Sequence, residues 1–200
     1  MNDVSRHYDA LIDENNDPVL DPKPLKEYME KWDGSRFLES MNLDESKTVL
    51  EIGIGTGRIA MKTAPLCKCL YGIDISEKTI QRASDHLSAY RNVKLICGDF
   101  MTYEFTEQFD VIYASLTFMH IEDKKTAIQK VSSLLRDKGL FVLSIDKNQD
   151  RFIDMGTRKI KVYPDNPTDI CSCILNAELS PVNQFEVDHA YIMVSKKGSL

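Results

Sequence analysis

Three glycines spaced two residues apart follow an apolar run in the first half of the chain. The run and the glycines read VLEIGIGTG over residues 49–57, and the acid Glu51 stands two residues before Gly53. Glycine adopts positive φ angles and lets a ligand approach the backbone without meeting a Cβ atom. A helix that begins just after such a turn presents free N–H groups and a partial positive charge. The pattern predicts a strand, a ligand-binding turn and a helix, in that order.

The spacing of the glycines separates two kinds of ligand. Dinucleotide-binding folds use G-x-G-x-x-G, in which the third glycine packs the helix against the strand. Here the third glycine, Gly57, comes one residue early, and Arg58 stands where the dinucleotide fingerprint requires glycine. This departure disfavours a nicotinamide-dependent oxidoreductase. A glycine-rich turn that binds no ligand stays open as an alternative.

Two further acids follow apolar runs. Asp74 closes the run YGID, 19 residues after Gly55, and Asp99 follows the run LICG. A carboxylate at the end of the second strand of a doubly wound nucleoside site can accept hydrogen bonds from both ribose hydroxyls. The alternative for Asp74 is a helix N-cap, which Ser76 can provide instead, and the alternative for Asp99 is a Gly-Asp turn.

Together, the E-x-G-x-G-x-G run, Asp74 and the pair Asp99-Phe100 resemble the motifs of class I S-adenosylmethionine-dependent methyltransferases. The resemblance covers about residues 45–145 and continues more weakly to residue 196. It implies that Asp99 accepts the adenine amino group, that Phe100 packs on the ring, and that Glu51 holds the methionine ammonium. It also implies S-adenosylmethionine as the cofactor and S-adenosylhomocysteine as the product. The cofactor-binding residues implied by the resemblance are Glu51, Gly53, Ile54, Gly55, Gly57, Asp74, Ile75, Asp99, Phe100, Ala114 and Ser115.

Apolar runs of strand length alternate with segments of helical period, and this alternation predicts a parallel sheet. The expected strands cover residues 48–53, 69–74, 93–97, 109–114 and 139–145. The runs 185–187 and 191–194 are too close for a parallel crossover, so we expect them to pair antiparallel. The predicted fold is α/β, with a doubly wound, mostly parallel seven-stranded sheet, an antiparallel terminal strand and helices on both faces.

Helix boundaries are marked by capping residues. Ser76 is expected to cap a helix that carries Ile80, Ala83 and Leu87 on one face. A helix over residues 122–136 is expected to end at Asp137-Lys138-Gly139, with the glycine in the left-handed conformation. Asn166-Pro167 starts a further predicted helix that runs to about Glu178. Residues 159–163 alternate like a short edge strand.

The N-terminal part is expected to form a helical lid over the cofactor. Residues 1–24 are polar and contain three prolines, which predicts an irregular arm, and two short helices follow within residues 25–41. Trp32 can stabilise a sulfonium through a cation–π contact, and Arg36 can pair with the methionine carboxylate. The alternative for Trp32 is that it anchors its helix to the sheet.

The segment after the fourth strand, residues 115–121, is where groups that select the methyl acceptor are expected. It lacks the motifs of DNA-amino, cytosine-C5 and protein-arginine methyltransferases, and the fourth-strand acid of Mg²⁺-dependent catechol enzymes. By elimination we expect a small-molecule acceptor. A protein or tRNA acceptor, or a non-catalytic S-adenosylmethionine-binding protein, stays open. His120 is the candidate catalytic base, because imidazole titrates near neutral pH.

Composition bounds the remaining possibilities. The 200 residues are 42% hydrophobic and 28% charged, which predicts a single domain made of an N-terminal part (1–44), a cofactor-binding core (45–146) and a C-terminal part (147–200). The net charge of −6 argues against nucleic acid and anionic membranes as partners. The five cysteines include no C-x-x-C pair, so no metal site is expected. No apolar run approaches the roughly 20 residues of a membrane span, and the N-terminus lacks the apolar core of a secretory signal, so we expect a cytoplasmic protein.

Overall fold

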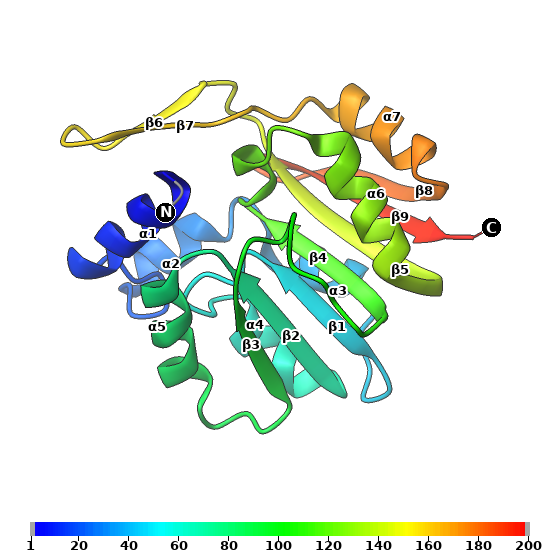
Figure 1. Cartoon of the computed structure of the whole chain (residues 1–200), viewed down its shortest axis with the longest axis horizontal. Coiled ribbons are helices and arrows are strands. Elements are labelled where there is room, and N and C mark those ends of the chain that lie inside the picture. The colour runs from blue at the N-terminus through cyan, green and yellow to red at the C-terminus, as the bar shows by residue number, and fades with distance from the viewer. Residues whose placement is uncertain (1–2, 199–200) are drawn as a thin grey trace.

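The computed structural model of the chain describes residues 3–198. At its centre is a seven-stranded sheet with the strand order β3-β2-β1-β4-β5-β9-β8 (Figure 1). Strands β1 to β5 pair in parallel with one another, whereas β9 pairs antiparallel with both β5 and β8. The sheet consists of β1 (Thr48–Ile52), β2 (Cys69–Asp74), β3 (Val93–Cys97), β4 (Phe109–Ser115), β5 (Leu135–Asp146), β8 (Leu179–Glu186) and β9 (Ala190–Lys197). The predicted fold class is confirmed.

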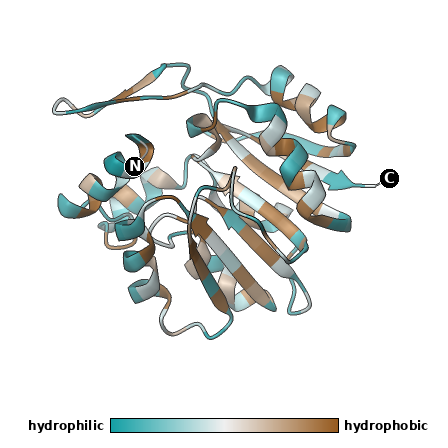
Figure 2. Cartoon of the chain, in the orientation of Figure 1, coloured by the Kyte–Doolittle hydropathy of each residue, from teal (hydrophilic) through white to brown (hydrophobic). Residues whose placement is uncertain are grey.

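Helices cover both faces of the sheet. One face packs against α3 (Gly34–Ser40), α4 (Ala60–Thr63) and α5 (Glu77–Leu87), and the other against α6 (Lys124–Leu134) and α7 (Pro167–Asn176). Successive strand residues point to opposite faces, so Val49 belongs to one apolar cluster and Leu50 to the other. The apolar colour in Figure 2 accordingly runs along the strands. Because both faces are covered, the strands show the nearly continuous apolar runs seen in the sequence.

The expected capping residues Ser76 and Asn166 begin α5 and α7: their side chains accept hydrogen bonds from backbone N–H groups of the first turn. The break between the two short N-terminal helices is also confirmed, because α2 (Lys23–Met29) ends before Asp33, which caps α3. The described residues also contain two 3-10 helices, η1 (Ala64–Leu66) and η2 (Phe118–His120).

The prediction of an irregular arm over residues 1–24 is wrong for residues 3–13, which form a helix, α1 (Asp3–Asp13), whereas residues 14–22 are irregular as expected. Val4, Tyr8 and Leu11 recur at helical spacing but are only half-buried, and the fully buried residues of the helix are Ser5 and His7. It is held by polar contacts with distant parts of the chain. Asp9 accepts a hydrogen bond from Ser76 Oγ, and Asp13 pairs with Lys78 on α5.

The predicted left-handed glycine at the end of α6 is also wrong. The helix stops at Leu134, and the chain enters β5 directly, with Lys138 rather than Gly139 at positive φ. A Cβ at Gly139 would lie 2.9 Å from the carbonyl oxygen of Arg136 and 3.1 Å from that of Asp110. Glycine is needed at residue 139 because these two carbonyl oxygens approach its Cα closely. The left-handed conformation is adopted by Lys138, within β5.

Residues 159–163 do not add to an edge of the main sheet. Instead β6 (Phe152–Asp154) and β7 (Lys159–Lys161) form a separate antiparallel hairpin. The hairpin projects beside α1 at the end of the molecule that holds the carboxyl ends of the parallel strands (Figure 1). Within residues 3–198, no helix is long and apolar enough to cross a membrane.

Candidate functional site

A cavity of about 460 Å³ lies at the carboxyl ends of β1, β2, β3 and β4. In an open α/β sheet this is the edge at which ligands bind. Its walls come from the turn after β1, the ends of the neighbouring strands, the segment after β4 and the N-terminal part of the chain. Ten of the residues predicted for the site line it: Glu51, Gly53, Ile54, Gly55, Asp74, Ile75, Asp99, Phe100, Ser115 and His120.

The three glycines of the turn serve different purposes. All three have positive φ, at +73° for Gly53, +57° for Gly55 and +97° for Gly57. A Cβ at Gly53 would lie 2.1 Å from Thr117 Oγ1, so this glycine makes room for the segment after β4. Gly57 packs against Leu87 of α5 and does not line the cavity. At Gly55 a Cβ would meet no protein atom within 4 Å, so only this glycine leaves space for a ligand.

Asp74 lies beside this turn with its carboxylate at the cavity wall. Its Oδ2 accepts a hydrogen bond from Gly55 N at 3.0 Å, and its Oδ1 accepts one from Ser76 N at 3.0 Å. Ser76 Oγ caps α5, so Asp74 is not needed as the helix cap. Burial raises the pKa of Asp74 above its ordinary value, although the backbone donors oppose the shift.

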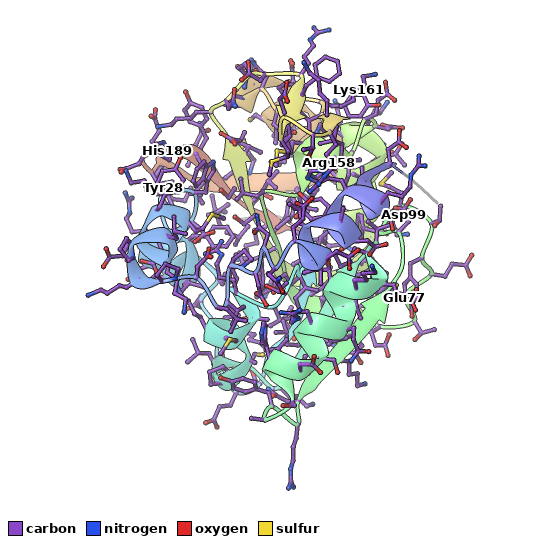
Figure 3. The ribbon with its side chains drawn as sticks, turned by 90° about the vertical axis from the view of Figure 1, so that its left-hand side faces the viewer. Tyr28, Glu77, Asp99, Arg158, Lys161 and His189 are labelled. Carbon is purple, nitrogen blue, oxygen red and sulfur yellow. The ribbon has the colours of Figure 1, made fainter. Side chains whose placement is uncertain are left out.

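Asp99 and Phe100 follow β3 at the adjacent strand end and form the next part of the wall. Asp99 Oδ1 accepts a hydrogen bond from Met101 N at 2.8 Å, which fixes its carboxylate in a tight turn. Figure 3 shows Asp99 near the N-terminal end of α1. The Phe100 ring is buried and lies in the cluster of Phe105 and Phe109.

Glu51 is the most deeply buried acid of the cavity, with 3% of its surface exposed. Tyr113 donates its hydroxyl proton to Glu51 Oε2 at 2.8 Å. Burial raises the pKa of Glu51 to about 8, and the bond from Tyr113 and the nearby Arg58 only partly offset this effect. In the free protein Glu51 is therefore largely protonated at neutral pH.

Arg58 lines the cavity and was not predicted as a site residue. Its guanidinium makes a two-pronged ion pair with Asp33, with nitrogen–oxygen distances of 2.5 and 3.1 Å. Ser115 Oγ donates to the same Asp33 carboxylate at 3.1 Å. The buried pair thus joins the turn after β1, the end of β4 and the start of α3. The sequence marks Arg58 only as a departure from the dinucleotide fingerprint, and Asp33 only as a helix break.

His120 and Tyr8 of α1 contact each other in the cavity wall. The Tyr8 hydroxyl and His120 Nε2 lie 2.8 Å apart, within hydrogen-bonding distance. Burial, His7 and Lys124 lower the pKa of His120 to about 4, so its ring is neutral at neutral pH. Its other nitrogen, Nδ1, is buried and has no hydrogen-bond partner within residues 3–198.

Four predicted residues do not line the cavity, namely Gly57, Ala114, Trp32 and Arg36. Arg36 points elsewhere, with its guanidinium 4.1 Å from the centre of the Phe185 ring, so Arg58 is the arginine at the cavity. Trp32 packs against His189 at 4.6 Å and against Tyr28, two residues that Figure 3 shows close together. This arrangement fits the anchoring alternative. Ala114 is buried in the sheet, where its side chain joins the apolar core.

Residues 3–22, which we call the lid segment, cover the cavity through Val4, Tyr8 and Pro18. Arg158 of the β6–β7 hairpin reaches this segment, where it pairs with Glu14 and donates from Nε to His7 Nδ1 at 3.1 Å. Figure 3 shows Arg158 directly above α1 and Glu77 of α5 below it. The lid segment is therefore held between the hairpin and α5.

The described part of the chain contains no group of three or more acids, histidines or cysteines placed to hold a metal ion. All five cysteines are free. The features that fit a nucleoside ligand are the open cradle at Gly55, the acids at two strand ends and the buried Thr56 Oγ1, which has no partner among residues 3–198.

Comparison with known sequences identifies the same part of the chain. Residues 49–139 match the sequence model of the family described as methyltransferase domain. An uncharacterized methyltransferase from Anoxybacillus flavithermus is 32% identical over 123 residues, which cover 60% of this chain and 57% of the relative. Another from Bacillus thuringiensis is 32% identical over 108 residues, which cover 52% of this chain and 50% of the relative. The matches thus span little more than half the length of these curated relatives.

Solved structures share the fold over almost the whole chain. The N-methyltransferase NodS from Bradyrhizobium japonicum, in complex with S-adenosylhomocysteine, has a TM-score of 0.76 at 17% identity and covers 99% of this chain and 100% of its own. The [4+2]-cyclase SpnF has a TM-score of 0.76 at 14% identity and covers 98% of this chain and 96% of its own. The family matches confirm the resemblance that the glycine turn and the two acids carry.

Proposed function

We propose that this chain, whose residues 49–139 match the sequence model of the methyltransferase domain family, transfers a methyl group from S-adenosylmethionine to a small-molecule acceptor. The observation that carries the proposal is the placement of three motifs around one cavity. The glycine turn, Asp74 and Asp99 leave three adjacent strands and line the same space.

The walls of the cavity fit the parts of this cofactor in order. Asp99 would accept the adenine amino group, with Phe100 against the ring, and Asp74 would accept the ribose hydroxyls. The turn at Gly55 would take the methionine part, whose ammonium would face Glu51. Burial costs an isolated carboxylate its hydration, so a cationic ligand group at Glu51 would restore its charge. Glu51 would then be the residue that gains most from the ligand.

When bound, the cofactor supplies a methyl group that is already activated by the positive sulfur. The chain then has to orient the acceptor in line with that methyl group and exclude water. The lid segment would serve the second purpose, since Tyr8 and Pro18 line the cavity.

A small-molecule acceptor is supported by the size and the charge of the site. The cavity of about 460 Å³ lies under the lid segment, and among the described residues the one lysine or arginine that lines it, Arg58, is already paired with Asp33. A tRNA acceptor would require unpaired cations for its phosphates. The net charge of −6 also disfavours a nucleic-acid acceptor, and the similar protein NodS is named an N-methyltransferase.

We propose a cytoplasmic location and a single domain over the three ranges expected from the sequence.

His120 is the proposed catalytic residue. Its neutral ring lines the cavity and can accept a proton from an acceptor that must lose one. A base with a pKa near 4 is weak at neutral pH. The proposal therefore favours an acceptor whose attacking atom is already unprotonated, or loses its proton as the new bond forms.

Calorimetry of the purified protein with S-adenosylhomocysteine, run beside NADH, tests the cofactor. We expect micromolar affinity for the first, about −8 kcal/mol, and no heat from the second. Failure of a folded sample to bind S-adenosylhomocysteine would overturn the proposal, and binding of NADH would replace it with redox chemistry.

A second candidate is a protein that binds S-adenosylmethionine without transferring the methyl group. It is favoured by the likeness to SpnF, which is named a [4+2]-cyclase although it shares the fold. The two candidates have the same cofactor contacts, so binding does not separate them. Release of S-adenosylhomocysteine in the presence of a panel of amines, phenols and thiols would establish transfer. Its absence across acceptor classes, together with tight binding, would favour the second candidate.

A further inference from the structure

Leu116 has a backbone conformation that leucine rarely adopts. Its φ is +55°, in the left-handed region, where the Cβ of an L-amino acid crowds its own backbone. Four other non-glycine residues in the described part of the chain have positive φ, and two of them are asparagines, which tolerate this region. Leu116 is the one of these five residues that lines the cavity. Backbone strain of this kind is concentrated at functional sites.

The residues on either side fix this conformation. Ser115 is the last residue of β4 that pairs with β5, and its Oγ donates a hydrogen bond to the buried Asp33 at 3.1 Å. On the other side, Thr117 Oγ1 donates to the carbonyl oxygen of Ser115 at 3.0 Å. Phe118, which begins η2, is buried in the core. The chain therefore has two residues in which to turn from β4 to η2, and Leu116 makes the left-handed step.

The turn itself does not require a leucine side chain, because glycine adopts this φ without strain. Leu116 is half-buried, and within residues 3–198 it belongs to neither of the two apolar clusters that form the core. Its side chain is instead part of the cavity wall. An apolar side chain that is kept at a strained position, outside the core and at the wall of a cavity, is expected where a ligand covers it.

We propose that Leu116 is a ligand-contacting residue whose strained backbone holds its side chain against the bound cofactor, and that the chain gives up stability at this position for affinity. The proposal rests on the proposed function in taking S-adenosylmethionine and S-adenosylhomocysteine as the ligands. Leu116 offers only apolar contact, and its neighbour Thr117 packs against Gly53 of the glycine turn. The contacted part would therefore be the uncharged chain of carbon and sulfur atoms that this turn would hold.

Two substitutions separate the strain from the side chain. Leu116→Ala removes the apolar contact but keeps a Cβ at positive φ, whereas Leu116→Gly removes both. At an ordinary position alanine is the more stabilising of the two, because glycine loses more conformational freedom on folding. At a strained left-handed position the order should be reversed. We expect the melting temperature of Leu116→Gly to lie about 2 to 4 °C above that of Leu116→Ala.

Calorimetry with S-adenosylhomocysteine measures the ligand contact. Both Leu116 variants should bind it about fivefold or more weakly than the wild type, the effect of losing part of the burial of a leucine side chain. Lys138 is the matched control, because its φ is +64° while its side chain is exposed and lies outside the cavity wall. Lys138→Gly should also melt above Lys138→Ala, but both should bind S-adenosylhomocysteine as tightly as the wild type.

Wild-type affinity in both Leu116 variants would overturn the ligand contact, and a melting temperature of Leu116→Ala equal to or above that of Leu116→Gly would overturn the strain. Either result leaves the proposed function standing, because the wild type still binds S-adenosylhomocysteine. Failure of the wild type to bind it would overturn the proposed function together with the contact. The order of the two melting temperatures would then still decide whether strain is stored at Leu116.

Discussion

The Tyr113 hydroxyl lies between Glu51 Oε2, 2.8 Å away, and Thr63 Oγ1, 2.9 Å away, in a part of the sheet that is closed to solvent. This arrangement keeps Glu51 hydrogen-bonded while its burial raises its pKa to about 8. Burial therefore favours the protonated acid in the free protein, and a cationic group beside it would favour the ionised form.

Ligand binding should release a proton. The ammonium of S-adenosylhomocysteine favours the ionised carboxylate, so below pH 8 Glu51 must lose its proton, and affinity should rise with pH from about 6 to 8, by up to tenfold per unit. Titrations in two buffers with different ionisation enthalpies should give different heats for the wild type. Glu51→Gln keeps an acceptor for Tyr113 and should abolish the difference. Equal heats in the wild type would contradict the assignment.

The same shift predicts how stability depends on pH. A carboxyl whose pKa is raised on folding stabilises the native state below its unfolded pKa, and this contribution is lost as pH rises through the folded value of about 8. Glu51→Gln does not ionise, so its stability relative to the wild type should increase between about pH 5 and pH 8. Urea denaturation at several pH values measures the difference. A pH-independent difference would show that Glu51 ionises freely in the folded chain.

Asp74→Ala should abolish ligand binding without unfolding the chain. Loss of two charge-assisted hydrogen bonds to the ribose should weaken affinity roughly 100-fold or more. Circular dichroism and thermal melting provide the control for folding, and calorimetry with S-adenosylhomocysteine measures the effect. Undiminished affinity in a folded Asp74→Ala protein would remove this residue from the site.

Gly53 and Gly55 should respond differently to substitution by alanine. Both have positive φ, but a Cβ at residue 53 would also collide with Thr117, whereas the space beside Gly55 is open. We expect Gly53→Ala to lower the melting temperature by several degrees, and Gly55→Ala to lower it less while reducing affinity for S-adenosylhomocysteine. If Gly55→Ala bound normally, the cradle would lie elsewhere.

Removal of residues 1–22 should weaken binding of S-adenosylhomocysteine, because Tyr8 and Pro18 close the cavity. The variant Arg158→Ala is a milder test, since it leaves the lid segment in place but removes its contacts with the hairpin through His7 and Glu14. Its dissociation rate for the ligand should increase while the melting temperature stays nearly unchanged. Unaltered affinity after the truncation would make the segment an appendage.

The parallel part of the fold could be predicted from the sequence because local signals agreed with the tertiary arrangement. The run Val49–Ile52 is apolar enough for a strand covered on both faces. Ser76 caps α5, the helix that begins directly after it. The acids at the strand ends follow from the same regularity, since parallel strands bring their carboxyl ends to one edge.

The polar parts of the site could not be predicted in this way. Helix α1 fully buries only Ser5 and His7, and its position depends on partners such as Ser76, Lys78 and Arg158, which are distant in the sequence. Arg58 rather than Arg36 lies at the cavity because Arg58 pairs with the buried Asp33, whereas Arg36 packs on Phe185. Neither fact has a signature within a few residues of the arginine.

Two of the ion pairs that hold the lid segment over the cavity can be reached by water. The ion pair between Lys78 and Asp13 is about half exposed, and so is the Glu14 end of the pair with Arg158. Such pairs contribute little, about 0 to 1 kcal/mol each, and dissolved ions screen them. The time that a ligand stays in the cavity should therefore shorten as ionic strength increases, while the buried contacts beneath it keep their geometry. Turnover limited by departure of the product would then be faster in concentrated salt than in dilute buffer.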